Sequence, residues 1–137
     1  MENLFEMKFT PAQVGAVSSL GLAHVGDGVF ELLCRTYLCA KGDSTVKTLH
    51  RDSVGLVNAP AQARFADALL PHLTEEETAF FRRGKNAHTH AAPKAATAKE
   101  YAKATGVETL FGALYLMGQT ERLNTLFWAV MEEIYGI

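Results

Sequence analysis

The sequence predicts an all-α fold of about six or seven helices, formed as one domain over residues 1–137. Helix-start signals recur along the chain, and each is followed by apolar residues at three- and four-residue spacing. No segment alternates between apolar and polar residues as a half-buried strand would. A length of 137 residues, with 48% hydrophobic and 20% charged, is typical of one globular domain with its own core.

The first two helices are predicted from capping residues and apolar spacing. Thr10 offers an N-cap, Pro11 fits the first helical position, and Gln13 is a capping-box partner. We expect this helix to continue to Leu20 and a second helix to begin after Gly21. The second should end at the glycine at position 42 and should turn one apolar face inward. That face carries Leu22, Val25, Val29, Leu32, Leu33 and Tyr37.

Short helices are predicted in the middle of the chain. Ser44 should start one that holds Val46 and Leu49, and another should begin at residues 58–60 and end near Pro71. Two further helices are expected to open with capping boxes, formed by Thr74 with Glu77 and by Thr97 with Glu100.

The ends of the later helices are predicted from the same signals. The helix that opens at residue 74 should end before Gly84, and Thr120 should cap the last helix.

Two carboxylates lie in segments that are otherwise built for burial. Asp27 is flanked by glycine on both sides in "LGLAHVGDGVFELL" at 20–33, and Glu108 follows Gly106 in "GVETLFGALY". A buried charge is costly without a partner, so each acid should meet a basic side chain, a ligand or a metal ion. Acids on facing helices can share a divalent ion, and an all-oxygen set favours Mg²⁺ or Mn²⁺. Glu31, one turn after Asp27, could be a second ligand or the partner of an arginine.

A basic island occupies residues 82–103, which carry a net charge of +5, whereas residues 1–81 and 104–137 carry −4 and −3. Within it, "NAHTHAAPKAAT" shows no apolar period and predicts a loop longer than a connection needs. The island is either a nucleic-acid contact or a solvated run of charge. His88 and His90, spaced H-x-H, could bind a metal, but no cysteine or third histidine lies nearby, and a surface pair is the alternative.

The chain carries no sign of export or membrane insertion. The start, "MENLFEMKFT", is acidic where a signal peptide is basic, and the longest apolar run, "LFGALYLM", is far shorter than the ~20 residues that cross a bilayer. We expect a cytoplasmic protein without membrane contact. Cys34 and Cys39 are too badly placed on one helix to pair, and are expected to be small core residues in a reducing compartment.

These segments together resemble the ribonuclease III endonuclease domain, most closely its compact Mini-III branch. "LAHVGDGVFELL" resembles the family's signature helix, and "VETLFGALY" resembles its second signature. Between them, in the family's order, lie "LHR" at 49–51, "VNAPAQA" at 57–63, "RRGKNA" at 82–87 and "PK" at 93–94.

The resemblance implies an Mg²⁺-dependent endoribonuclease that cleaves double-stranded RNA, with Asp27 and Glu108 as its catalytic and metal-binding residues. Its role in the family is maturation of the large-subunit (23S) ribosomal RNA precursor, carried out by a homodimer, to which a ribosomal protein could present the RNA. The RNA contacts would come from Arg82, Arg83, Lys85, Asn86 and Lys94, and from His50 and Arg51. For the last two, surface pairing with a neighbouring acid is the alternative.

Two departures from the longer enzymes of the family are informative. Those enzymes carry acids where this chain has Ala23 and Thr105, and Mini-III enzymes share both losses. Thr105 and Glu31 are therefore considered as supporting residues only. We also expect the domain to act without an appended double-stranded-RNA-binding domain. The losses leave two alternatives open: a catalytically degenerate RNA-binding scaffold, and a plain helical dimer whose acids are held in salt bridges.

Overall fold

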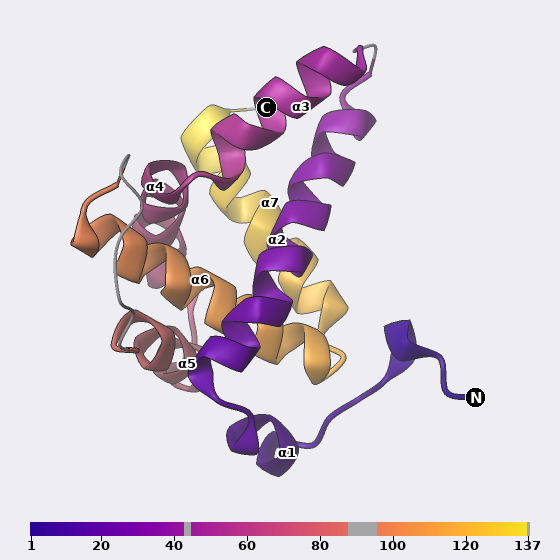
Figure 1. Ribbon diagram of the computed structural model, residues 1–137, viewed down its shortest axis with the longest axis vertical. Helices are drawn as coiled ribbons and strands as arrows, with labels where there is room; N and C mark the ends of the chain where they lie inside the picture. The colour runs from indigo at the N-terminus through magenta and orange to yellow at the C-terminus, as the bar shows by residue number, and fades with distance from the viewer. Residues whose placement is uncertain (43–44, 88–95, 137) are drawn as a thin grey trace.

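The computed structural model describes residues 1–42, 45–87 and 96–136, which form seven α-helices and two short 3₁₀-helices with no strand among them (Figure 1). The all-α prediction is therefore confirmed. The α-helices are α1 (Pro11–Ala16), α2 (Ser19–Ala40), α3 (Val46–Val57), α4 (Ala59–Leu69), α5 (Glu75–Lys85), α6 (Ala98–Leu116) and α7 (Thr120–Tyr135). The 3₁₀-helices are η1 (Leu4–Glu6) and η2 (Leu70–His72).

Helix α6 forms the centre of the fold, and α2, α4, α5 and α7 pack around it (Figure 1). Every residue of 104–114 is buried except Glu108, so the helix is covered on all sides along this stretch. A helix that is apolar all round is stable only inside a protein. Glu108 is thus the one interruption in the most enclosed part of the chain.

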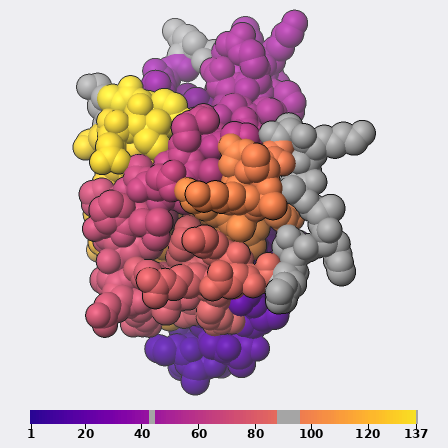
Figure 2. All heavy atoms as spheres, turned by 90° about the vertical axis from the view of Figure 1, so that its left-hand side faces the viewer, coloured from indigo at the N-terminus to yellow at the C-terminus, as the bar shows by residue number. Residues whose placement is uncertain are grey.

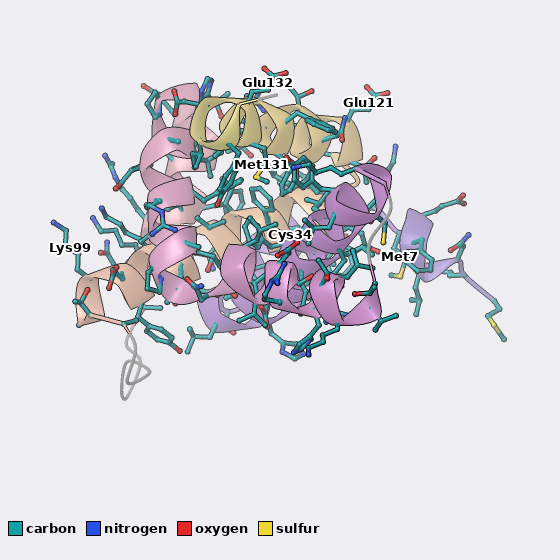
Figure 3. The ribbon with its side chains drawn as sticks, turned by 90° about the horizontal axis from the view of Figure 1, so that it is seen from above. Met7, Cys34, Lys99, Glu121, Met131 and Glu132 are labelled. Atoms are coloured by element: carbon teal, nitrogen blue, oxygen red, sulfur yellow. The ribbon has the colours of Figure 1, made fainter. Side chains whose placement is uncertain are left out.

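The core is aromatic and joins four helices. Each of α2, α4, α6 and α7 contributes one phenylalanine, and the rings of Phe30 and Phe65 pair with each other and with those of Phe111 and Phe127. The rings of Phe30 and Phe65 lie edge to face with centroids 5.0 Å apart, a favourable arrangement for aromatic pairs. Figure 3 shows Cys34 and Met131 pointing into this interior, while Glu121 and Glu132 point away from it on the outer side of α7.

Helices α2 and α6 touch through their backbones because glycine occupies both helices where they cross. A Cβ added at Gly26 would overlap the carbonyl group of Glu108 and lie 2.8 Å from the amide nitrogen of Gly112. A Cβ at Gly112 would in turn overlap the carbonyl of Leu22. The close approach therefore requires glycine at both positions. It also brings two acids onto adjacent helices near the contact: Asp27, which follows Gly26, and Glu108, whose carbonyl group lies at the contact.

The predicted helix caps agree with the structure better than the predictions of which side chains face the core. The three expected capping boxes, at Thr10, Thr74 and Thr97, are all formed. The boundary placed at Gly21 was wrong, because Ser18 accepts a hydrogen bond from the Gly21 amide and starts α2 at Ser19. Leu32 was wrongly placed on the inward face of this helix and is 57% exposed.

Three further boundary predictions need correction. Helix α5 continues past Gly84 to Lys85, because this glycine packs tightly against Thr109 rather than ending the helix. Helix α7 has Gln119 as its N-cap residue without a side-chain cap, and Thr120 is already helical. Ser44 lies outside the described residues, and α3 is capped by Thr45.

The two cysteines are free, as expected, but they differ in environment. Cys34 is buried, and burial, followed by the nearby charge of Glu31, raises the pKa of its thiol to about 12. Cys39 is exposed, so its placement in the core was wrong. None of the helices in the described ranges combines the length and hydropathy needed to cross a membrane.

The backbone contact between α2 and α6 can be tested with single methyl groups. We expect Gly26→Ala to lower the free energy of unfolding by about 2 kcal/mol or more, because the overlapped atom is backbone and cannot move aside alone. Gly55→Ala on α3 is the control, since its added Cβ meets nothing within 4 Å and should raise stability by about 0.5–1 kcal/mol. Urea unfolding measures both, and a Gly26→Ala protein as stable as the parent would refute the contact.

Candidate active site

The two carboxylates singled out in the sequence line one cavity of about 330 Å³ between α2, α4 and α6. Asp27 comes from α2, Gln62 from α4, and Tyr101 and Glu108 from α6. Figure 2 shows a face on which α4, α5 and the first turns of α6 lie together. The fold thus brings together residues that are 81 positions apart in the chain.

The α3–α4 junction forms one wall of this cavity, and local capping fixes its shape. Asn58 is both the last cap of α3 and the first of α4, since its Oδ1 accepts from the Ala61 amide at 2.9 Å and its Nδ2 donates to the Val54 carbonyl at 3.1 Å. The Gln62 side-chain amide then donates to the Val57 carbonyl at 2.9 Å. The expected helix start at residues 58–60 is confirmed, and hydrogen bonds from the side chains of Asn58 and Gln62 to the backbone hold the junction in place.

Asp27 is exposed and Glu108 is half-buried, and the two carboxyl groups face each other. Burial is the main cause that raises the pKa of Glu108 to about 8, and hydrogen bonding with Asp27 and the charge of Asp27 raise it further. Hydrogen bonding from the side-chain amide of Gln62 favours the charged form of Glu108 and lowers its pKa in part. In the absence of a cation, Glu108 therefore holds a proton at neutral pH, which relieves the repulsion between the two acids.

Neither acid has a basic partner within the described residues. The ion pairs found there are Glu31 with Arg35, Asp52 with Arg51, Asp67 with Lys103, and Glu77 with Arg122. Glu77 shows how this chain compensates a buried acid, since Arg122 contacts it through two nitrogens at 2.8 Å and lowers its pKa. Salt bridges to both acids, as the plain-dimer alternative requires, are not found in this part of the chain.

The donor chemistry of the cavity fits a hard divalent cation. Asp27 and Glu108 offer carboxylate oxygens and Gln62 an amide group, whereas no group of three or more His, Cys, Asp or Glu side chains gathers anywhere in the described ranges. Mg²⁺ usually keeps several waters and is held by one or two carboxylates, so it needs no larger protein set. Asp27 and Glu108 are the residues that would hold it.

The two residues considered as supporting ones do not line the cavity. Glu31 pairs with Arg35 at 2.8 Å on the surface of α2. Thr105 is buried and donates to the Tyr101 carbonyl of its own helix at 3.0 Å, and its backbone lies against Gly84 of α5. The structure therefore keeps both apart from the facing acids.

The predicted RNA contacts separate into free and engaged side chains. Arg82, Lys85 and Asn86 are exposed at the end of α5. Arg83 instead donates to the Val17 carbonyl at 2.9 Å and to Ser19 Oγ at 3.3 Å, so it fastens α5 to the start of α2. Lys94, His88 and His90 lie outside the described residues.

His50 and Arg51 are both exposed on α3. Arg51 Nε lies 3.3 Å from Asp52 Oδ1, so the surface pairing weighed as an alternative for this residue is present.

Sequence reasoning missed Gln62 and Tyr101 as residues of the cavity. Gln62 could have been found, because it stands one turn before Phe65 and Ala66 on the face of α4 that is otherwise apolar and buried. Tyr101 gave no comparable signal, since it lies in the polar first turns of α6.

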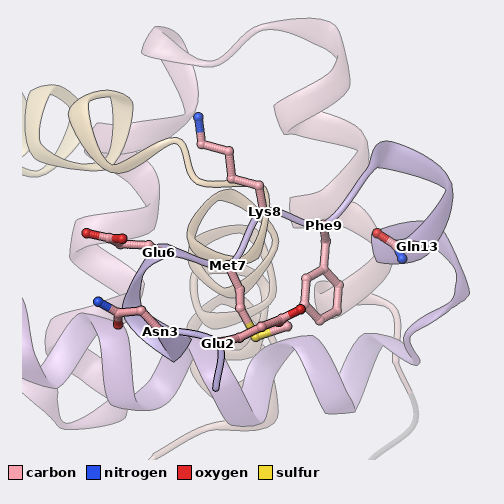
Figure 4. Close-up of a pocket in the computed structure, with 7 residues that line it drawn as sticks. All are labelled: Glu2, Asn3, Glu6, Met7, Lys8, Phe9 and Gln13. Carbon is pink, nitrogen blue, oxygen red and sulfur yellow. The ribbon is translucent and has the colours of Figure 1, made fainter.

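A larger hollow of about 520 Å³ lies elsewhere and is formed by the N-terminal segment alone (Figure 4). Its lining comes entirely from residues 2–13, and Figure 4 shows Glu6 and Lys8 directed away from Phe9 and Met7. The segment joins the body through the Phe9 amide, which donates to the Leu116 carbonyl at 2.7 Å. This hollow gathers no facing acids and is not a candidate active site.

The sequence pattern of the Ribonuclease III domain family matches residues 20–119, a span that contains Asp27, Gln62 and Glu108. The chain belongs to this family. It is 45% identical over 115 residues to Mini-ribonuclease 3 of Symbiobacterium thermophilum, covering 84% of this chain and 88% of that one. It is 37% identical over 125 residues to Mini-ribonuclease 3 of Clostridium tetani, covering 90% and 83%.

A solved structure gives the same result for the fold. The X-ray structure of a Fusobacterium nucleatum protein superposes with a TM-score of 0.78 at 31% identity, covering 86% of this chain and 91% of that one. The resemblance seen in the motifs is therefore confirmed, and so is the expected class of enzyme, an endoribonuclease. Ribonuclease III enzymes act on double-stranded RNA and generally depend on divalent metal ions.

The proton on Glu108 makes the stability of the fold depend on pH. Because the pKa of Glu108 is raised from 4.5 to about 8 in the folded state, its contribution to stability is complete below pH 4.5 and is lost as the pH rises through 8. We expect the free energy of unfolding of the parent to fall with pH in this window more steeply than that of Glu108→Gln, by up to about 1.4 kcal/mol per pH unit. Urea unfolding with a chelator present, from pH 5.5 to 8.5, measures this difference, and equal slopes would contradict it.

Proposed function

We propose that this chain is an Mg²⁺-dependent endoribonuclease that cleaves double-stranded RNA in the maturation of the large-subunit (23S) ribosomal RNA precursor. One observation supports it above all: two carboxylates from different helices, Asp27 and Glu108, face each other in a cavity without a basic partner among the described residues. An arrangement that is unfavourable in isolation becomes favourable when a divalent cation lies between the acids.

Asp27 and Glu108 would hold the cation together, one from each of two helices. Mg²⁺, or Mn²⁺ in its place, would polarise the scissile phosphate and lower the pKa of a bound water. Asp27 is exposed and would lie on the side of the approaching RNA backbone, whereas Glu108 is half-buried on α6. Glu108 must release its proton before both carboxylates can act as ligands, so cation binding and proton release are coupled.

The RNA contacts are assigned to exposed groups near the end of α5. Arg82 and Lys85 would neutralise phosphates, and Asn86 would donate to the sugar–phosphate backbone. Lys94, outside the described residues, and His50 and Arg51 on α3 would extend this contact. Recognition would follow the A-form shape and the 2′-hydroxyls, since the major groove of that helix is too narrow to be read.

Arg83 is assigned a different role. Its bonds to the Val17 carbonyl and to Ser19 Oγ set the position of the end of α5 relative to α2. It would therefore support the RNA contacts of its neighbours instead of making one itself.

The working unit is proposed to be a homodimer in the cytoplasm, acting as a single catalytic domain per chain. One site cuts one strand, so cleavage of a duplex needs two sites, which a two-fold axis supplies. Large apolar side chains exposed on α2 and α3, with Leu32 at 57% and Val54 at 50%, leave surface for such an interface. A ribosomal protein could present the precursor RNA to this dimer.

The catalytic role of the acids is tested by Asp27→Asn and Glu108→Ala on precursor 23S RNA and on a plain RNA duplex, with Mg²⁺ and with chelator. We expect each variant to keep the parent's circular dichroism and RNA binding while cleavage falls more than about 100-fold, because even changes to groups that only support metal ligands cost 10–100-fold. Glu121→Gln, on the outer side of α7 (Figure 3), is the matched control and should cleave like the parent.

Two outcomes would contradict this function. An Asp27→Asn protein that cleaves as fast as the parent would remove Asp27 from the mechanism. A parent protein that forms a complex with the duplex and yields no product with Mg²⁺ would favour the degenerate scaffold, which the absence of acids at Ala23 and Thr105 suggests.

A further inference from the structure

Gln62 is an unusual residue for its position. It is 3% exposed on the inner face of α4, among apolar neighbours such as Phe65, and it lines the same cavity as Asp27 and Glu108. Its Nε2 donates to the Val57 carbonyl at 2.9 Å, which fixes the orientation of the amide. Its Oε1 is the one buried side-chain nitrogen or oxygen atom in the described ranges without a hydrogen-bond partner.

An unpaired buried acceptor costs free energy, and an apolar side chain of the same size would avoid that cost. Buried polar atoms in native proteins have partners as a rule, so an exception points to a missing water, ion or catalytic role. None of the groups in the described residues donates a hydrogen bond to the Gln62 oxygen. Once both carboxylates are ionised, as cation binding requires, Asp27 and Glu108 can only accept hydrogen bonds, and the Asn58 amide is already bonded to the Val54 carbonyl.

Within the described residues, the cavity thus brings together two carboxylates and the Gln62 oxygen, and no positively charged side chain lines it. Two carboxylates carry the charge that balances one divalent cation, and a neutral oxygen can join them without adding repulsion. Carboxylates at positions 23 and 105 would have added negative charge to the site. This chain has the uncharged Ala23 and Thr105 there, and Thr105 lies against α5.

We infer that Gln62 is the third protein group of the cation site and contributes its side-chain oxygen to the cation, directly or through one water. This inference rests on the proposed function, because it takes Asp27 and Glu108 as the other two groups. The bond from Nε2 to the Val57 carbonyl holds the amide in place, so that α4 and the α3–α4 junction take part in the site together with α2 and α6.

The test is Mn²⁺ binding to the full chain without RNA, measured by titration calorimetry and by the loss of the free-ion electron paramagnetic resonance signal. Gln62→Leu and Gln62→Met remove the oxygen and keep the volume, and Gln62→Glu keeps an oxygen there. We expect the two apolar variants to bind Mn²⁺ about 10-fold more weakly, the size of effect known for groups around metal ligands. Gln62→Glu should bind at least as tightly as the parent.

Circular dichroism and melting without cation show which variants are folded, and the leucine and methionine variants serve as alternatives to each other. Glu121→Gln should bind Mn²⁺ like the parent. If a folded Gln62→Leu or Gln62→Met protein binds Mn²⁺ like the parent while Asp27→Asn does not, Gln62 is no part of the site and the proposed function stands. If Asp27→Asn also binds like the parent, the proposed cation site itself is refuted.

Discussion

The backbone contact between α2 and α6 is the constraint on which the rest of the structure depends. Gly26 and Gly112 let two helices approach until side chains no longer separate them, and the Glu108 carbonyl lies where a Cβ of residue 26 would be. With this approach, Asp27 and Glu108 become neighbours instead of residues on two separate surfaces. The aromatic core beside the crossing, centred on Phe30 and Phe111, keeps the helices from sliding apart.

The same chain treats its buried acids in two opposite ways. Glu77 is buried and held by Arg122, which lowers its pKa and satisfies both carboxylate oxygens. Glu108 is met by another acid, which raises its pKa to about 8. The first arrangement is complete in the isolated protein, whereas the second is relieved by a proton on Glu108 or, in the function we propose, by a divalent cation. That contrast is the reason for proposing that the endoribonuclease activity depends on a metal ion.

Much of this could be predicted from the sequence, because local rules decide it. Capping residues such as Thr74 act within one turn, and the two acids stood out because glycine and apolar residues surround them. The predictions that failed concern properties that depend on contacts between distant segments. Whether Leu32 faces the core, and whether Arg83 is free or bonded to the Val17 carbonyl, is settled by the neighbours that pack there. Gln62 lies in the motif VNAPAQA, but the sequence could not show that its side-chain oxygen has no hydrogen-bond partner in the described residues.

The measurement that tests the central claim most directly is a double-mutant cycle on Mn²⁺ affinity, with Asp27→Asn, Glu108→Gln and the double variant compared with the parent at pH 8.5. If the two carboxylates share one cation, the double variant should lose far less affinity than the two single losses combined, because removing either acid already disrupts the common site. Two independent losses that simply add would show that the acids do not act together, and would contradict this account.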